Sequence, residues 1–163
     1  MNKLLFVLSS ILLFASMAMA KGKLVSQWNC GKPTEAHSID AGDQANHTYV
    51  ISKGTCTSTK GEVGGVREQE GGGPQFSEAT GDRTTWHGLF IVTMANGDKL
   101  HYSYSNKGAG VLKDGQFQSG TNQWSIVGGT GKFAGAKGKG TCLGSGNADG
   151  TVSWDCQGTY TLK

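Results

Sequence analysis

The sequence of 163 residues lacks several features that would place it in common protein classes. Its only two prolines are Pro33 and Pro74, which argues against a collagen-like or proline-rich linker protein. After residue 20, no window of fifteen residues keeps a 3.6-residue apolar period without a glycine, so no amphipathic helix is predicted. The apolar run near the start falls short of the ~20 residues that a membrane-spanning helix needs, and no second run occurs. We therefore expect neither a helical domain nor a membrane span.

The sequence is also poor in motifs that carry known chemistry. It contains no G-x-S-x-G elbow, no H-E-x-x-H motif and no C-x-x-C spacing. Its lysines are scattered instead of forming a basic stripe interleaved with aromatic residues, so nucleic acid is not a predicted partner. No catalytic residue can be assigned and no cofactor is predicted. The groups considered for acid–base work are His87, His101, Tyr102, Tyr104 and Asp155.

One cluster of potential metal ligands occurs between residues 37 and 47. His37, Asp40, Asp43 and His47 supply two imidazoles and two carboxylates, which are groups that bind zinc and other divalent metals. Their spacing matches no established zinc pattern, and aspartate is common in loops because its side chain stabilises turns. No metal site is therefore predicted.

Residues 1–20 have the features of a signal peptide. Lys3 supplies the positive charge, Leu4 to Ala15 form the apolar stretch, and residues 18–20 (Ala-Met-Ala) match a small-residue cleavage site. The remaining residues, 21–163, are long enough for one domain. We expect a secreted or periplasmic protein.

Glycine is abundant, with 27 residues, all of them after residue 20. Glycine at this density, among short apolar alternations, predicts strands joined by tight turns. The clearest alternation lies at residues 152–162, where Trp154, Cys156 and Tyr160 share one face and polar residues occupy the other. Eight or nine antiparallel strands follow from this reading. The predicted strands are 23–30, 46–56, 62–70, 75–80, 84–95, 98–106, 121–128, 137–146 and 151–162.

A hairpin is predicted around Asn96-Gly97, a dipeptide suited to a two-residue type I′ turn. This turn would pair Thr93 with Leu100, Ile91 with Tyr102 and Leu89 with Tyr104. The opposite face of the first strand would then be apolar as well and would need a cover, so we expect a homo-oligomer, dimer or trimer. The residues assigned to that interface are Trp86, Phe90, Val92 and Met94.

Four cysteines in an exported protein favour two disulfides. Cys142 and Cys156 lie almost symmetrically about a predicted turn at 147–150, which brings them opposite each other across a hairpin. By elimination, Cys30 would pair with Cys56 and link the first two strands. Four cysteines allow three connectivities, and the other two stay open at this point.

Residues 124–140, WSIVGGTGKFAGAKGKG, contain a short apolar strand, a glycine-rich turn and a second extended run. Gly129, Gly131 and Ala134 fit a dinucleotide-binding spacing, but the glycines that follow forbid the helix which such a site needs. The segment resembles the GGTG-[K/R]-F-x-x-A-x-G motif of the dirigent and allene oxide cyclase barrels, including their bacterial relatives. This resemblance implies an all-β, eight-stranded calycin-like barrel, often trimeric, that acts on bulky hydrophobic molecules.

Aromatic residues recur on the inferred inner faces of the strands. They would either fill the barrel as a packed core or line an apolar pocket that is open at one end. Three functions stay open: a barrel that binds a small hydrophobic or phenolic molecule, an isomerase or cyclase, and a structural or surface-interaction domain with a filled core. We rank binding first, because no catalytic constellation is visible. The predicted pocket residues are Trp28, Tyr102, Tyr104, Trp124, Trp154 and Tyr160.

Overall fold

The structure of the protein is a computed structural model that describes residues 20–163, apart from the side chains of residues 105–107. In this range the chain forms ten strands and one 3₁₀ turn, and none of its helical structure is long and apolar enough to cross a membrane. The predicted signal segment lies outside the described residues except for its last residue. The elements are β1 (Ala20–Cys30), β2 (Glu35–Asp40), β3 (His47–Lys60), β4 (Glu62–Val63), β5 (Val66–Thr80), β6 (Arg83–Met94), β7 (Lys99–Lys113), β8 (Gln116–Gly129), η1 (Gly131–Phe133), β9 (Lys137–Gly146) and β10 (Val152–Leu162).

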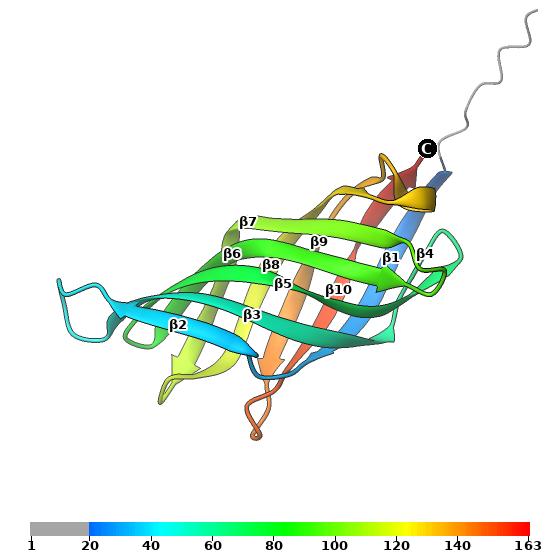
Figure 1. Cartoon of the computed structure of the whole chain (residues 1–163). Helices are drawn as coiled ribbons and strands as arrows, with labels where there is room; N and C mark the ends of the chain where they lie inside the picture. The colour runs from blue at the N-terminus through cyan, green and yellow to red at the C-terminus, as the bar shows by residue number, and fades with distance from the viewer. Residues whose placement is uncertain (1–19) are drawn as a thin grey trace, which may run out of the picture.

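Eight of these strands close into an antiparallel barrel, as predicted. The order runs from β1 through β10, β9, β8, β7, β6 and β5 to β3, and the barrel closes because β3 also pairs with β1. Strand β2 adds to β3 beyond the point where β1 ends, and it extends the sheet outside the closed part (Figure 1). The short β4 pairs with the start of β5 at the other end of the barrel.

Glycines inside strands are the main reason why the strand boundaries differ from the prediction. The run Gly71–Gly73 was expected to separate two strands, but β5 continues through it, with the Phe90 ring packed over Gly71. Similarly, β7 and β8 extend to a turn near residue 114, and the Trp86 ring lies over Gly108. A β-carbon at these positions would collide with the ring, so these glycines make room for aromatic side chains.

The hairpin between β6 and β7 differs from the prediction in its register. Gly97 has a positive φ of 84° but Asn96 does not, and the Gly97 amide bonds to the Met94 carbonyl. This is a type I turn followed by a left-handed glycine, not a type I′ turn. As a result Ile91 pairs with His101 instead of Tyr102. The shift of one residue exchanges the two faces of β6 relative to β7.

The predicted oligomer face is wrong for the same reason. Val92 and Met94 have no exposed surface, Trp86 is 6% exposed, and Phe90 packs against the core. The outer face of β6 instead carries Leu89 and Ile91, which are 44% and 39% exposed. The apolar residues assigned to a subunit interface therefore belong to the barrel's interior.

Both predicted disulfides are present. Cys30 is bonded to Cys56 between β1 and β3, and Cys142 to Cys156 between β9 and β10. In each pair the two cysteines are direct cross-strand neighbours. The bridges therefore lie on two different parts of the barrel wall.

The GGTG segment closes one end of the barrel. Gly131 adopts a φ of 49°, the Lys132 amide bonds to Asp98, and the Lys99 amide bonds to the Thr130 hydroxyl. These contacts fix the corner on the β6–β7 hairpin and direct Phe133 into the core, where it has no exposed surface. The neighbouring apolar residues at this end are Leu24, Val63, Met94, Leu100, Ala136 and Leu162.

Candidate functional site

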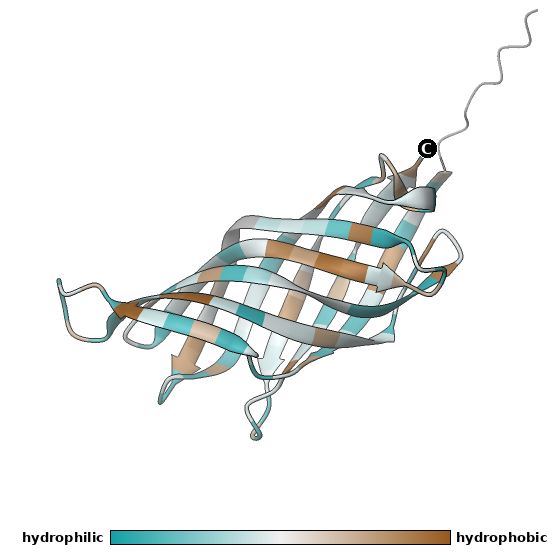
Figure 2. Ribbon diagram, in the orientation of Figure 1, coloured by the Kyte–Doolittle hydropathy of each residue, from teal (hydrophilic) through white to brown (hydrophobic). Residues whose placement is uncertain are grey.

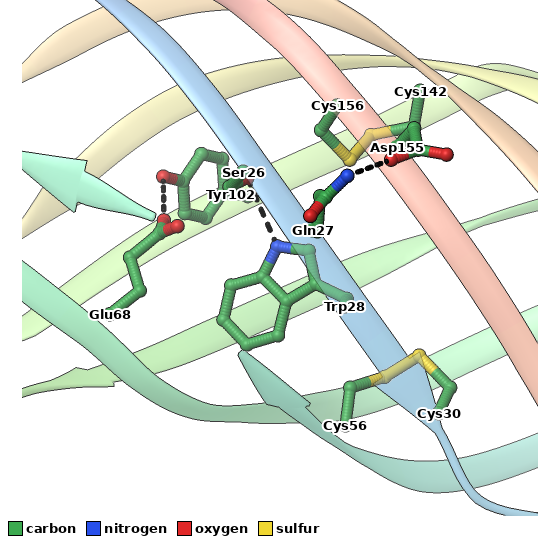
Figure 3. Close-up of a disulfide and its surroundings, with 10 residues drawn as sticks. All are labelled: Ser26, Gln27, Trp28, Cys30, Cys56, Glu68, Tyr102, Cys142, Asp155 and Cys156. Atoms are coloured by element: carbon green, nitrogen blue, oxygen red, sulfur yellow. Dashed lines mark hydrogen bonds between the residues drawn. A yellow bond between two sulfur atoms is a disulfide. The ribbon is translucent and has the colours of Figure 1, made fainter. Parts of the chain in front are cut away.

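A polar centre lies inside the otherwise apolar barrel. The Glu68 side chain on β5 is 2% exposed, and its Oε1 accepts a hydrogen bond of 2.9 Å from the Tyr102 hydroxyl on β7. Ser26 on β1 is also 2% exposed, and its Oγ accepts a bond of 3.1 Å from Trp28 Nε1. Figure 3 shows the Glu68–Tyr102 bond and the Trp28 ring on β1 in one view. Three strands thus contribute polar groups to one buried region.

A β-bulge turns Glu68 into the barrel. Glu68 pairs with Met94 on β6 and Glu70 pairs with Thr93, so Gln69 is an extra residue on β5. Because of this insertion, Glu68 and Gly71 both face inward, while Gln69 and Glu70 are both exposed. Bulges commonly reorient side chains next to functional sites.

Burial changes the chemistry of this centre. It raises the pKa of Glu68 to about 7, against the opposing effects of the hydrogen bond from Tyr102 and of the nearby Ser26 hydroxyl, which both lower it. Burial, together with the Glu68 carboxyl, also holds the pKa of Tyr102 well above its usual range. The carboxyl therefore takes up and releases a proton near neutral pH, while the phenol stays protonated and donates to it.

Two buried polar atoms of this centre have no hydrogen-bond partner among the described residues. They are Glu68 Oε2 and Trp124 Nε1. The Trp124 ring meets the Tyr102 ring edge to face, with a centroid distance of 5.3 Å, so both atoms belong to the region around Tyr102. Buried polar atoms are nearly always paired in folded proteins, and an unpaired one needs an explanation.

The six predicted pocket residues all point into the barrel but form separate groups. Trp28, Tyr102 and Trp124 surround the polar centre. Trp154 packs on Trp86 with a centroid distance of 5.9 Å, and Phe117 contacts both rings. The remaining two lie apart from both groups. Tyr104 is 9% exposed, with a pKa raised by burial to about 12, and the Tyr160 hydroxyl accepts the Gly64 amide.

Glu68 and Ser26 were not predicted as site residues. Glu68 lies in the segment Val66–Glu70, and alternation from Val66 gives Glu68 and Glu70 the same face. Only the bulge places Glu68 and Glu70 on different faces, and the residue types do not predict the bulge. Ser26 shares the alternation of Leu24 and Trp28, which is a signal that could have placed it inside.

A second polar cluster lies where the β2–β3 loop meets β5. His47 is 7% exposed, with Nδ1 at 2.6 Å from Asp43 and Nε2 at 2.9 Å from Glu78, whose carboxylate also accepts from Tyr49. Hydrogen bonding to the Asp43 and Glu78 carboxylates raises the pKa of His47. The cluster ties the β2–β3 loop to β5.

Two hollows lie on the outer surface of the barrel, and the lining of the larger one includes Trp124 of the polar centre. One, of about 620 Å³, lies over β7 to β10 and is lined by polar side chains such as Gln123 and Thr141. The other, of about 360 Å³, lies over β2, β3, β5 and β6. Its main lining residues are Ile39, Tyr49, Ile51, Phe76, Glu78 and His87.

Comparison with known proteins adds no family to these observations. The sequence matches no protein-family model and no curated protein.

Proposed function

We propose that this protein is an exported barrel that binds a small hydrophobic or phenolic molecule in its interior, beside Glu68. The observation that carries the proposal is the pair of buried, unpaired atoms Glu68 Oε2 and Trp124 Nε1 in an aromatic surrounding. A phenolic hydroxyl would donate to the carboxyl, and a ligand oxygen would accept from the indole. Sites for small molecules combine mostly apolar walls with a few polar groups of this kind.

Binding in this position requires aromatic side chains to move. The Trp28 ring meets Phe90 edge to face at 5.0 Å, and the Trp124 ring packs over Gly140 and Gly158, so rings occupy the layer around Glu68. A ligand would replace ring contacts with its own and would gain roughly 25 cal/mol per Å² of apolar area that it buries. Tryptophan fluorescence should therefore report binding directly.

The proposal also includes where the protein is located and which family it resembles. Two disulfides are typical of proteins that fold in an oxidising environment, which supports secretion or periplasmic localisation. The closed eight-stranded barrel is compatible with the resemblance of residues 124–140 to the dirigent and allene oxide cyclase barrels.

Calorimetric and fluorescence titration with 2-naphthol and with dodecanoate tests the proposal. We expect saturation at one ligand per chain and quenching of tryptophan emission. Glu68→Gln should weaken binding of the phenol about tenfold, because a charge-assisted hydrogen bond is lost. Glu70→Gln, on the same strand but exposed, is the matched control and should bind normally. Absence of saturable binding by either compound would leave a structural domain with a filled core as the better description.

One observation favours an isomerase or cyclase as the second candidate. A carboxyl with a pKa of about 7 beside a tyrosine hydroxyl is suited to transfer a proton at neutral pH. With an unsaturated fatty-acid epoxide as probe, chiral chromatography should then detect a cyclised product. Glu68→Gln should abolish turnover while the probe still binds.

We also propose that the protein forms a homo-oligomer, although the residues first assigned to its interface lie inside the barrel. Sedimentation equilibrium of the purified protein decides between a monomer and a dimer or trimer. A strict monomer at tens of micromolar would contradict it.

A further inference from the structure

Strand β2 is an exposed sheet edge outside the barrel. It pairs with β3 on one side, and it has no strand partner on the other side among residues 20–163. All six of its residues are exposed. An edge of this kind presents unpaired backbone groups that can hydrogen-bond to another extended chain.

The hydrogen-bond pattern indicates which amides face the free edge. Ala41, just after β2, donates its amide to the His47 carbonyl on β3. Amides of alternate residues in a strand point to the same side, so those of His37 and Ile39 also face β3. The amides of Ala36 and Ser38 therefore face outward.

An apolar surface adjoins this edge. Tyr49, Ile51 and Phe76 are 48%, 44% and 47% exposed, and Ile39 on β2 is 70% exposed. Together with Glu78 and His87 they line the 360 Å³ hollow, and Figure 2 shows hydrophobic colouring on β2 and on the adjoining part of β3. A strand added to β2 would place every second side chain on this same face.

The charges favour a foreign segment over a second copy of this chain. Glu35 and Asp40 stand at the two ends of β2. Pairing two copies edge to edge would bring the carboxylates of both copies into one short ladder, where like charges repel. A partner with basic residues at its ends would instead find opposite charges.

We propose that the β2 edge and the adjoining hollow bind an extended peptide segment, with alternating apolar residues and basic ends, as an added strand. Backbone hydrogen bonds to Ala36 and Ser38 would hold the segment, and its apolar side chains would contact Ile39, Ile51 and Phe76. The inference does not depend on the interior site. In β-strand addition, main-chain hydrogen bonds commonly give the affinity and side-chain contacts give the specificity.

Fluorescence polarisation with the labelled, end-blocked peptide KVTVTVK tests the proposal. We expect saturable binding that is lost when alternate amides of the peptide are N-methylated. The peptide EVTVTVE should bind at least about tenfold more weakly because its end charges are reversed. Equal binding of all three peptides would overturn the proposal.

Variants locate the contact on the protein. Ile39→Ser should weaken binding about tenfold through lost apolar contact, and Ser38→Pro should abolish it by removing an edge amide. Leu143→Ser is the matched control, since Leu143 is 63% exposed on β9, far from β2 in the sheet. If Leu143→Ser weakens binding as much as Ile39→Ser, the peptide does not use this face.

Hydrogen exchange on the unmodified protein provides a test that needs no variant. The peptide should slow exchange at the amides of Ala36 and Ser38, with little change at His37 and Ile39, whose amides already face β3. If the peptide instead slows hydrogen exchange in the strands of the closed barrel, it enters the barrel. If the protein forms a dimer that is lost in Ser38→Pro, a second copy occupies the edge. Either result would overturn the proposal.

Discussion

The wall formed by β9 and β10 differs from the wall formed by β3 and β5 in where each places its apolar surface. On β9 and β10 the inner positions include glycines such as Gly140 and Gly158, on which the Trp124 ring rests, while the outer face carries mainly polar side chains together with the exposed Leu143. On β3 and β5 the inner face includes the charged Glu68, and exposed apolar side chains occupy the outer face. The first wall therefore serves packing, whereas the second offers polar chemistry inside and an apolar surface outside.

Removing the disulfides one at a time should have the largest effect on stability, because one bridge links β9 to β10 within the first wall and the other joins β3 of the second wall to β1. Cys30–Cys56 spans a separation of 26 residues and Cys142–Cys156 one of 14. In the chain-entropy model their loss costs about 3.5 and about 3 kcal/mol respectively. Urea unfolding measures both losses of stability, in variants that replace the two cysteines of one disulfide by alanine. A much larger loss at the shorter loop would indicate that the glycine-rich wall depends on its bridge for packing.

Glu68→Gln should change how stability depends on pH. The folded-state pKa of about 7 lies above the ordinary value of 4.5, so the folded protein keeps a proton that the unfolded chain releases between these values. Stability therefore falls as pH rises through this window, by about 3 kcal/mol in total. Urea midpoints from pH 4 to pH 9 should be flatter for Glu68→Gln, and Glu70→Gln should retain the wild-type slope.

A methyl group on glycine should have a different effect at Gly140 of the first wall, which a ring covers, than at Gly54 of the second wall, which is open. In Gly140→Ala the new β-carbon would meet the Gln157 carbonyl and the Trp124 ring, so we expect a loss of about 1–3 kcal/mol from overpacking. In Gly54→Ala on β3 the nearest atom would be Pro33 Cα at 3.9 Å, which is an ordinary contact. This variant should match the wild type or exceed its stability slightly. Equal losses in thermal unfolding would contradict the expected difference between these two glycine positions.

His47→Gln should have the smallest effect and should appear only in the pH profile. The raised pKa of His47 means that its ionic contacts contribute below the ordinary value of 6.5 and are lost as pH rises through the raised folded value. The variant should therefore lower the melting temperature near pH 6 more than near pH 9. A pH-independent loss would indicate that the ring acts by packing alone.

The sequence was sufficient for the fold class, the disulfide pairing and the glycine-rich corner, since alternation and cysteine spacing follow directly from local geometry. The hairpin register was not predictable from Asn96-Gly97, because that dipeptide also suits a turn with a single left-handed residue. Glycine runs such as Gly71–Gly73 were mistaken for a turn, because the rings that cover them come from distant strands. The inward orientation of Glu68 was not predictable for the same reason, because it depends on a bulge in β5 where it pairs with β6.

The pairing of β1 with β10 brings Ala20 beside Leu162. A short linker between these ends would leave the barrel's hydrogen-bond ladder unbroken, and the exposed loop after β2 offers a place for new ends. A circular permutant of this kind would begin with β3 and finish with β2. The β2 edge would then become a terminal strand, free to be shortened or replaced without opening the barrel.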